Sequence, residues 1–195
     1  TVAELNIPAA LPETGAGFAD VPQGHWAETS INKIAALGLI KGVGSGLYDM
    51  ESPISRGSLA TILYRFSNGT PGLGCSFWDV KSGMYYTQGV AWAAKAGVVT
   101  GFTDEIFAPE QIITREQMAV MMARYAKLVG MNTAADPRTL DAFADGGETG
   151  EWAANGVAWC VNNGILKGRG GNTLDPTAQV TRGEVAVMLD RFIAL

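Results

Sequence analysis

The stretch ITREQ, residues 113–117, occurs three times in this chain in related form. The other copies are ISRGS at residues 54–58 and VTRGE at residues 180–184. Each copy places an apolar residue, a Ser or Thr, and an Arg in the same order. Recurrence at intervals of about sixty residues predicts an internal repeat that governs the fold of the whole chain.

The hydroxyl residue of each copy has the features of a helix N-cap. Ser55, Thr114 and Thr181 each precede an apolar run with helical spacing, and a hydroxyl there accepts a hydrogen bond from the first helical turn. In the second and third copies, Gln117 and Glu184 follow three residues later and complete a capping box, which the first copy lacks. A helix is therefore expected to begin directly after each N-cap.

Three further landmarks keep the same order around this motif. A Phe-x-Asp stretch opens each unit: FADV at 18–21, FWDV at 77–80 and FADG at 143–146. A stretch with a central Gly follows: ALGLIKG at 36–42, KAGVVTG at 95–101 and NNGILKG at 162–168. Each unit ends with an Arg beside an aromatic or apolar residue: YRF at 64–66, ARY at 123–125 and DRF at 190–192. Three units of one design follow one another.

Within a unit the apolar residues have helical spacing on both sides of a glycine-rich loop, so each unit is expected to be helix, loop, helix. Gly38, Gly97 and Gly164 are expected to end the first helix of each unit. One such unit cannot bury its apolar face alone, so the three must pack together. We predict an all-α chain with repeats at 18–66, 77–128 and 143–195, and linkers at 1–17, 67–76 and 129–142.

Composition restricts the class of protein. The 195 residues carry a net charge of −5 and 47% apolar residues, which argues against binding to nucleic acid or anionic lipid and favours a packed core. No run of about 20 apolar residues predicts membrane insertion. Cys160 lies in an apolar helical run, which favours a buried free thiol over a bridge to Cys75. With His25 as the one histidine, no histidine-rich metal site and no cofactor are expected.

The four landmarks, together with GHWA at 24–27, resemble the S-layer homology family in order and spacing over residues 18–195. The resemblance implies a pseudo-threefold spindle of three repeats with grooves between neighbouring copies. In that family the grooves bind a secondary cell-wall polysaccharide linked to peptidoglycan, commonly one carrying ketal-linked pyruvate. The resemblance therefore implies a monomeric, non-catalytic module that holds a secreted protein non-covalently on the bacterial cell wall, as in an S-layer.

The chain departs from the family pattern in each repeat. The first copy has Ser-Arg-Gly-Ser where the family prefers Thr-Arg-Ala-Glu, the second has Tyr85 in place of Trp, and the third lacks the Val after Asp145. These departures predict unequal grooves.

The motif arginines are the first candidates for ligand binding. Arg56, Arg115 and Arg182 follow an N-cap directly, where the positive end of the helix dipole disfavours a cation by about 0.3 to 1 kcal/mol. A ligand carboxylate between the guanidinium and the free N–H groups of that helix end would compensate, as the resemblance also implies. The alternative is an internal salt bridge to one of the Phe-x-Asp aspartates.

Three further sets of equivalent residues are candidates for the glycan site, each with a structural alternative. Trp26, Tyr85 and Trp152 can present ring faces to a sugar or can anchor the core. Asp20, Asp79 and Asp145 can cap local backbone N–H groups or line a groove. Gly42, Gly101 and Gly168 can allow unusual backbone angles in a turn or the close approach of a ligand.

Two other function classes remain open at this level. A carbohydrate-active enzyme would need a pair of carboxylates, yet the acidic residues here recur at capping and turn positions, and His25 has no repeated Ser or Cys partner. A protein–protein docking module would bind without glycan. The stretch LPETG at 11–15 resembles a sortase signal, but an apolar segment and a basic tail do not follow it, so a chance match is the favoured interpretation.

Overall fold

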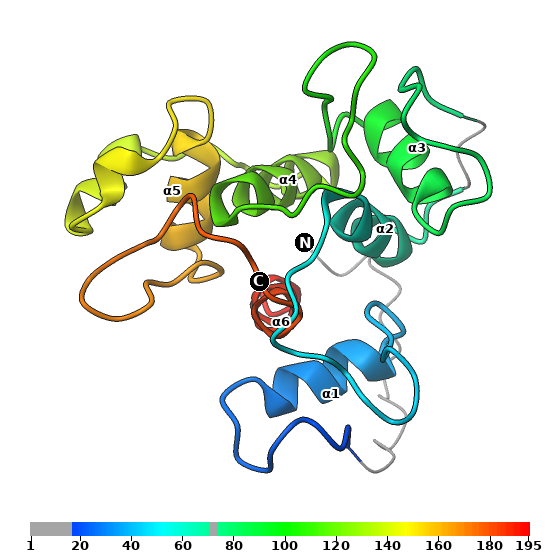
Figure 1. Cartoon of the computed structure of the whole chain (residues 1–195). Coiled ribbons are helices and arrows are strands. Elements are labelled where there is room, and N and C mark those ends of the chain that lie inside the picture. The colour runs from blue at the N-terminus through cyan, green and yellow to red at the C-terminus, as the bar shows by residue number, and fades with distance from the viewer. Residues whose placement is uncertain (1–16, 71–73) are drawn as a thin grey trace.

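The structure, a computed structural model, describes residues 17–70 and 74–195. LPETG and almost all of the predicted linker 1–17 lie outside the described residues. The described residues form six α-helices and two 3-10 helices, with isolated bridges in place of strands, which confirms the predicted all-α class (Figure 1). The elements are α1 (Glu28–Ala36), α2 (Arg56–Phe66), α3 (Thr87–Lys95), α4 (Arg115–Leu128), η2 (Pro137–Ala142), η3 (Gly146–Glu148), α5 (Ala154–Asn162) and α6 (Arg182–Ile193).

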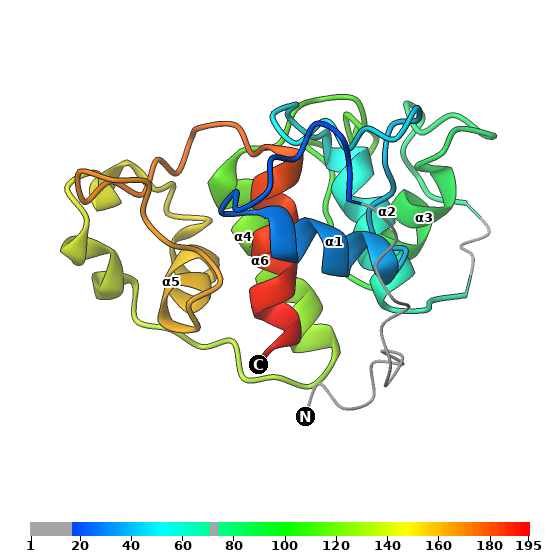
Figure 2. The same ribbon diagram turned by 90° about the horizontal axis from the view of Figure 1, so that it is seen from below.

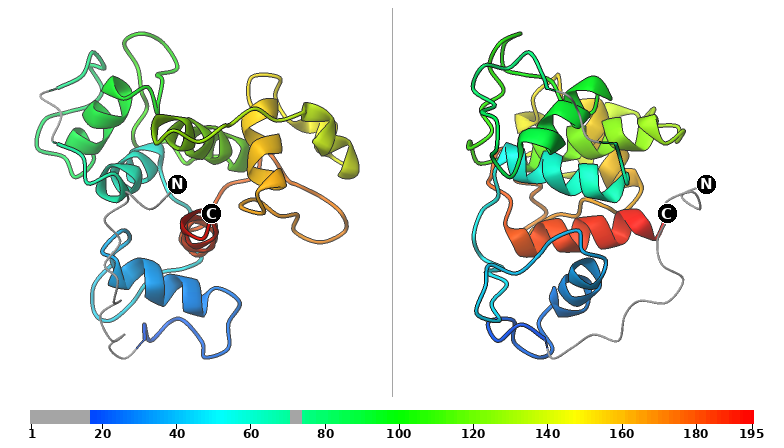
Figure 3. Two further views of the ribbon diagram at one scale, coloured as in Figure 1. Left: turned by 180° about the vertical axis from the view of Figure 1, so that it is seen from behind. Right: turned by 90° about the vertical axis from the view of Figure 1, so that its right-hand side faces the viewer.

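The two helices of one sequence repeat do not form the packing unit. Instead, α3 of the second repeat packs on α2 of the first, and α5 of the third packs on α4 of the second (Figure 3). The ring closes where α1 packs on α6, which brings the first and last helices together (Figure 2). Helices α2, α4 and α6 lie around the centre, and α1, α3 and α5 lie outside them (Figure 1). Each packed helix pair therefore combines helices from two different repeats, consecutive ones for α2–α3 and α4–α5 and the first and third for α1–α6.

A closed ring of backbone hydrogen bonds joins the three motif copies at the centre. The Ile54 N–H donates to the Val180 carbonyl (3.1 Å), the Val180 N–H to the Ile113 carbonyl (3.3 Å), and the Ile113 N–H to the Ile54 carbonyl (3.0 Å). All three apolar side chains are buried. Because each bond crosses between repeats, the three helix starts are fixed relative to one another.

An aromatic cluster joins the same three helices near their other ends. Phe66, Tyr125 and Phe192 come from the closing motifs of the three repeats, and their ring centroids lie 5.3 to 5.8 Å apart. All three side chains are buried. The central helices are thus held together at both ends by residues that recur in the sequence.

The predicted helix boundaries are confirmed. The side chains of Ser55, Thr114 and Thr181 accept a hydrogen bond from the third helical residue, and only the second and third copies form a full capping box. Gly38, Gly97 and Gly164 follow the first helix of each repeat with φ values of 70°, 72° and 67°. Glycine adopts this left-handed conformation without steric cost, which is why the helices end there.

Both cysteines are free thiols, Cys160 fully buried and Cys75 half-buried. Burial raises the pKa of the Cys160 thiol, so it stays protonated and behaves as a small apolar side chain. The predicted buried free thiol at this position is confirmed.

The Tyr125 hydroxyl is buried without a hydrogen-bond partner. A buried polar group left unpaired costs about 1 to 3 kcal/mol, so Tyr125→Phe is expected to raise the free energy of unfolding by about 1 kcal/mol. Urea unfolding followed by far-UV circular dichroism measures this change. Tyr48→Phe is the control, because the Tyr48 hydroxyl donates to the Arg182 carbonyl at 3.4 Å and its loss should not stabilise the fold. A destabilised Tyr125→Phe variant would contradict the prediction.

Candidate functional site

The motif arginines occupy the first position of α2, α4 and α6, as predicted, and each reaches into the loop of another repeat. Arg56 donates from Nε to the Phe107 carbonyl (3.0 Å) and from Nη2 to the Thr100 carbonyl (3.0 Å). The other two arginines repeat this pattern at 2.8 to 2.9 Å: Arg115 with Leu174 and Lys167, and Arg182 with Tyr48 and Lys41. Each arginine therefore ties two repeats together through backbone carbonyls.

The N–H groups at these helix starts are not free, so this part of the sequence interpretation is wrong. The Arg56 and Gly57 N–H groups donate to the carbonyls of Gln111 and Pro109, both at 2.9 Å, and the Ser58 N–H donates to the N-cap Ser55. Equivalent bonds occupy the first turns of α4 and α6. The extended segment before the next motif docks on each helix start and takes the donors that a ligand carboxylate would need.

The predicted alternative, an ion pair between a motif arginine and a Phe-x-Asp aspartate, is also wrong within the described residues. The carboxylates of Asp20, Asp79 and Asp145 each accept two backbone N–H groups in the loop of their own repeat. The donors are Tyr48 and Asp49, Phe107 and Ala108, and Leu174 and Asp175, at 2.6 to 3.0 Å. The expected capping of local N–H groups is therefore wrong: the aspartates do bind backbone N–H groups, but these lie nearly thirty residues along the chain.

Aspartate and arginine hold the same loop residue from opposite sides. The Phe107 N–H donates to Asp79 while its carbonyl accepts from Arg56, and Leu174 and Tyr48 are held in the same way in the other two loops. The hydrogen bonds from the backbone, led by those of Tyr48 and Leu174, hold the pKa of Asp20 and Asp145 below the usual value. These aspartates fix the loops that the arginines grip.

The loop glycines are required by the loops themselves. None of Gly42, Gly101 and Gly168 has a positive φ, so the expectation of unusual backbone angles is wrong. A Cβ at Gly101 would overlap the carbonyl oxygens of Thr103 and Ile106, and one at Gly42 would lie 2.6 Å from the Leu47 carbonyl oxygen. A side chain at these glycines is excluded because the backbone of the same loop approaches closely, not because a ligand does.

The three equivalent aromatic residues lie on the surface. Trp26, Tyr85 and Trp152 are 61%, 57% and 60% exposed, so the interpretation of these rings as core anchors is wrong. Each ring lines a different groove. The structure therefore leaves these rings free to contact a ligand.

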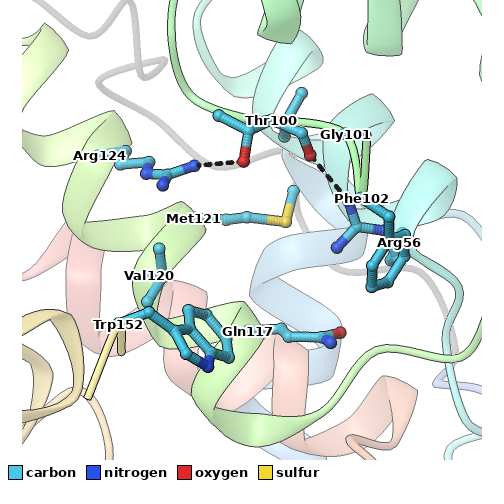
Figure 4. A pocket seen from close by; sticks show the side chains of 10 residues that line it. Arg56, Thr100, Gly101, Phe102, Gln117, Val120, Met121, Arg124 and Trp152 are labelled. Atoms are coloured by element: carbon cyan, nitrogen blue, oxygen red, sulfur yellow. Dashed lines mark hydrogen bonds between the residues drawn. The ribbon is translucent and has the colours of Figure 1, made fainter. Parts of the chain in front are cut away.

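The largest of these grooves, here called groove A, has a volume of about 450 Å³. It brings together the start of α2, the loop after α3, one face of α4 and the Trp152 ring from the third repeat (Figure 4). The lining residues are Arg56, Val99, Thr100, Gly101, Phe102, Gln117, Val120, Met121, Arg124 and Trp152.

Groove B, of about 290 Å³, is built from the equivalent positions one repeat further on. Its ring comes from the first repeat, because the spindle closes there. The lining residues are Trp26, Arg115, Leu166, Lys167, Gly168, Arg169, Glu184, Val187, Met188 and Arg191.

The third groove, groove C, has a volume of about 380 Å³ and a different lining, so the three grooves are unequal, as the sequence departures predict. It is lined by Thr61, Tyr64, Arg65, Gly83, Met84, Tyr85, Thr87, Gln88 and Gly89. Neither Arg182 nor Gly42 belongs to it. The Tyr85 hydroxyl lies 3.2 Å from the Ser55 Oγ and 3.0 Å from the Ser58 Oγ, so the ring is bound to the start of α2.

Two residues that contact the arginine site of groove A, Arg124 and Phe102, were not predicted from the sequence. Arg124, from the closing motif ARY, donates from Nη1 to the Thr100 Oγ1 at 3.2 Å, so Thr100 binds both guanidinium groups of the groove (Figure 4). Phe102 lies with its ring centroid 4.5 Å from the Arg56 guanidinium carbon. The recurring arginine of the closing motifs was a signal for Arg124, since Arg65 and Arg191 also line grooves. No sequence signal indicated Phe102, because the equivalent positions in the other repeats hold Val43 and Arg169.

The electrostatics of groove A favour an anion. Its lining holds two guanidinium groups and no carboxylate, in a chain of net charge −5. Burial, with a smaller effect of Arg124, lowers the pKa of Arg56 to about 10, which still leaves it charged at neutral pH. Groove A can thus hold a negatively charged group beside an exposed indole ring.

The described residues contain no group of three or more His, Cys, Asp or Glu side chains placed to hold a metal ion. In the same part of the chain, no helix has both the length and the apolar character needed to cross a membrane.

A model of the S-layer homology domain matches the chain three times, at residues 17–60, 76–119 and 142–186. The chain is 35% identical to an S-layer protein of Bacillus licheniformis and 33% identical to S-layer protein EA1 of Bacillus anthracis, in each case over 97% of its own length and 21% of the relative. An amylopullulanase of Thermoanaerobacterium thermosulfurigenes is 29% identical over 85% of the chain, which covers 9% of that enzyme. The chain thus spans about a fifth of the S-layer relatives it matches.

The two arginines of groove A should differ in their contribution to stability. Arg56→Ala removes a buried guanidinium and leaves two carbonyls unpaired, so we expect it to lower the free energy of unfolding by about 2 to 3 kcal/mol. Arg124→Ala removes one exposed hydrogen bond to Thr100 and should cost less than about 1 kcal/mol. Urea unfolding of both variants measures the difference, and equal losses would contradict it.

Proposed function

The chain belongs to the S-layer homology domain family, and on that premise we propose that it is a non-catalytic module that anchors a secreted protein at the bacterial cell surface. Its ligand is a secondary cell-wall polysaccharide, bound without a covalent link. The observation that carries the proposal is groove A, whose lining holds two arginines and no carboxylate beside exposed aromatic rings.

A sugar with a carboxylate, such as a pyruvate ketal, is the ligand that groove A fits best. A guanidinium has five N–H donors, and Arg56 spends two of them on the Phe107 and Thr100 carbonyls. Those bonds orient the group, and its remaining donors can hold a carboxylate through charge-assisted hydrogen bonds. Arg124 adds a second positive charge on the same groove.

The ring faces supply the rest of the recognition. Trp152 and Phe102 are 60% and 52% exposed, and an aromatic face packs well against the C–H bonds of a sugar ring. Because Trp152 comes from the third repeat while Arg56 comes from the first, the proposed site needs the whole assembled spindle.

The two alternative functions gain less support. A glycosidase needs two carboxylates that flank the scissile bond, and the lining of groove A contains none. The similarity to an amylopullulanase concerns 9% of that enzyme. A module that docks on another protein would bind without glycan, and it is distinguished by the experiment below.

Co-sedimentation with purified Gram-positive wall sacculi tests the proposal. The chain should sediment with intact sacculi, and binding should be lost once the secondary polysaccharide is stripped. Trp152→Ala and Arg124→Ala should each weaken binding about tenfold, because each removes a contact with the sugar while the fold survives. The matched control is Trp78→Ala, since Trp78 is 70% exposed and lines none of the three grooves.

Retention on stripped sacculi would refute the proposal and indicate peptidoglycan or a protein partner. Release of new reducing ends from the isolated polymer would instead establish the enzyme.

A further inference from the structure

One position at the start of the central helices differs in charge between the grooves. The residue three places after the N-cap is Gln117 in groove A and Glu184 in groove B. Both side chains accept the N–H of the N-cap residue, at 3.3 Å for Gln117 and 3.1 Å for Glu184, so both complete a capping box. The local helix therefore accepts either residue, and the difference lies in what faces the groove.

In groove B the carboxylate is already bound by arginines. The Glu184 Oε1 accepts from the Arg115 Nη1 at 3.1 Å and from the Arg169 Nε at 2.9 Å. The Arg169 Nη2 lies 2.7 Å from both carboxylate oxygens and also donates to the Gln179 carbonyl. Arg115 in groove B is thus paired with an anion that belongs to the protein.

Groove A has neither a carboxylate at the position of Glu184 nor an arginine at the position of Arg169. Phe102 occupies the position of Arg169, directly after the loop glycine, and its ring covers the Arg56 guanidinium. Gln117 presents a neutral amide where Glu184 presents a carboxylate. The arginine of groove A has no acidic partner among the residues that line the groove.

We propose that this position decides the charge of the sugar that each groove accepts. Groove A takes the sugar that carries a carboxylate, whereas groove B takes an uncharged sugar of the polymer, because Glu184 occupies the place of the ligand carboxylate beside Arg115. A second anion at that place would meet the charge of Glu184 at short range. Lys167 and Arg191 keep groove B positive overall, so the discrimination acts at the arginine contact rather than by long-range attraction. This inference rests on the proposed function.

The indole N–H signals of Trp152 and Trp26 report on grooves A and B separately in a proton–nitrogen NMR titration. The probes are a monosaccharide carrying a ketal-linked pyruvate and the methyl ester of the same compound, which lacks the charge and is larger by one methyl group. In the unmodified chain the acid should shift the Trp152 signal at concentrations at least five times lower than those that shift the Trp26 signal. The ester should shift the Trp26 signal at least as readily as the acid does.

Exchanging the two side-chain types should exchange the preferences of grooves A and B for the acid. Both variants keep an acceptor for the N-cap N–H, so the capping box and the helix start are retained. Gln117→Glu should weaken binding of the acid in groove A about tenfold, and Glu184→Gln should strengthen its binding in groove B by a similar factor. Asp141→Asn removes one negative charge outside all three grooves and should change neither affinity by more than twofold. Thermal unfolding checks that each variant is folded.

The outcomes separate this inference from the proposed function. If neither probe shifts the signal of Trp152 or Trp26, the proposed function fails. If the acid shifts both signals over the same range in the unmodified chain, or if the two exchanges leave the affinities within twofold, the grooves bind but the role of Gln117 and Glu184 is refuted.

Discussion

Three backbone hydrogen bonds at the centre of the spindle, between Ile54, Ile113 and Val180, are the constraint on which the rest depends. Each N–H is satisfied only by a carbonyl from another repeat, and the ring is buried, where an unpaired backbone group costs far more than a typical bond contributes. No repeat can therefore complete this structure by itself. Because the three residues directly precede the N-caps, closing the ring sets the place of every helix start and of the arginine that follows it.

The arginines then extend this order outward to the grooves. Each arginine binds a loop residue that an aspartate holds on its other side. In the loop of the second repeat, Asp79 accepts the N–H of Phe107, and Arg56 donates to the carbonyl of the same residue. The guanidinium groups are thereby oriented before any ligand arrives, which reduces the entropy that binding must overcome. A structural role and a proposed binding role do not compete in these side chains, because the donors used for the loop leave others for a ligand.

Features that depend on neighbouring residues could be predicted from the sequence, and features that depend on closure of the ring could not. The N-caps, the capping boxes and the terminating glycines follow from local backbone chemistry and were predicted correctly. The packing of α1 on α6 joins the two ends of the sequence, and no local pattern encodes it. The expectation of free N–H groups failed for the same reason: the carbonyls of Gln111 and Pro109 come from the next repeat. Of the residues predicted for the site, Arg56, Arg115 and the three exposed rings line grooves, whereas Arg182, Gly42 and the three Phe-x-Asp aspartates line none of the three. Arg124 was missed although its motif recurs, and Phe102 has no counterpart in the other repeats and gave no signal.

This division explains how a nearly symmetric fold can carry unequal grooves. The motif arginine, the aspartate and the loop glycine do the same structural work in every repeat, so they cannot distinguish one groove from another. Distinction must come from positions where the fold sets only a loose requirement. The third residue after the N-cap needs no more than an acceptor for one N–H, which an amide and a carboxylate supply equally well. At such a position the charge is free to differ while the helix start stays the same, so the chain can vary recognition without disturbing the ring that holds it together.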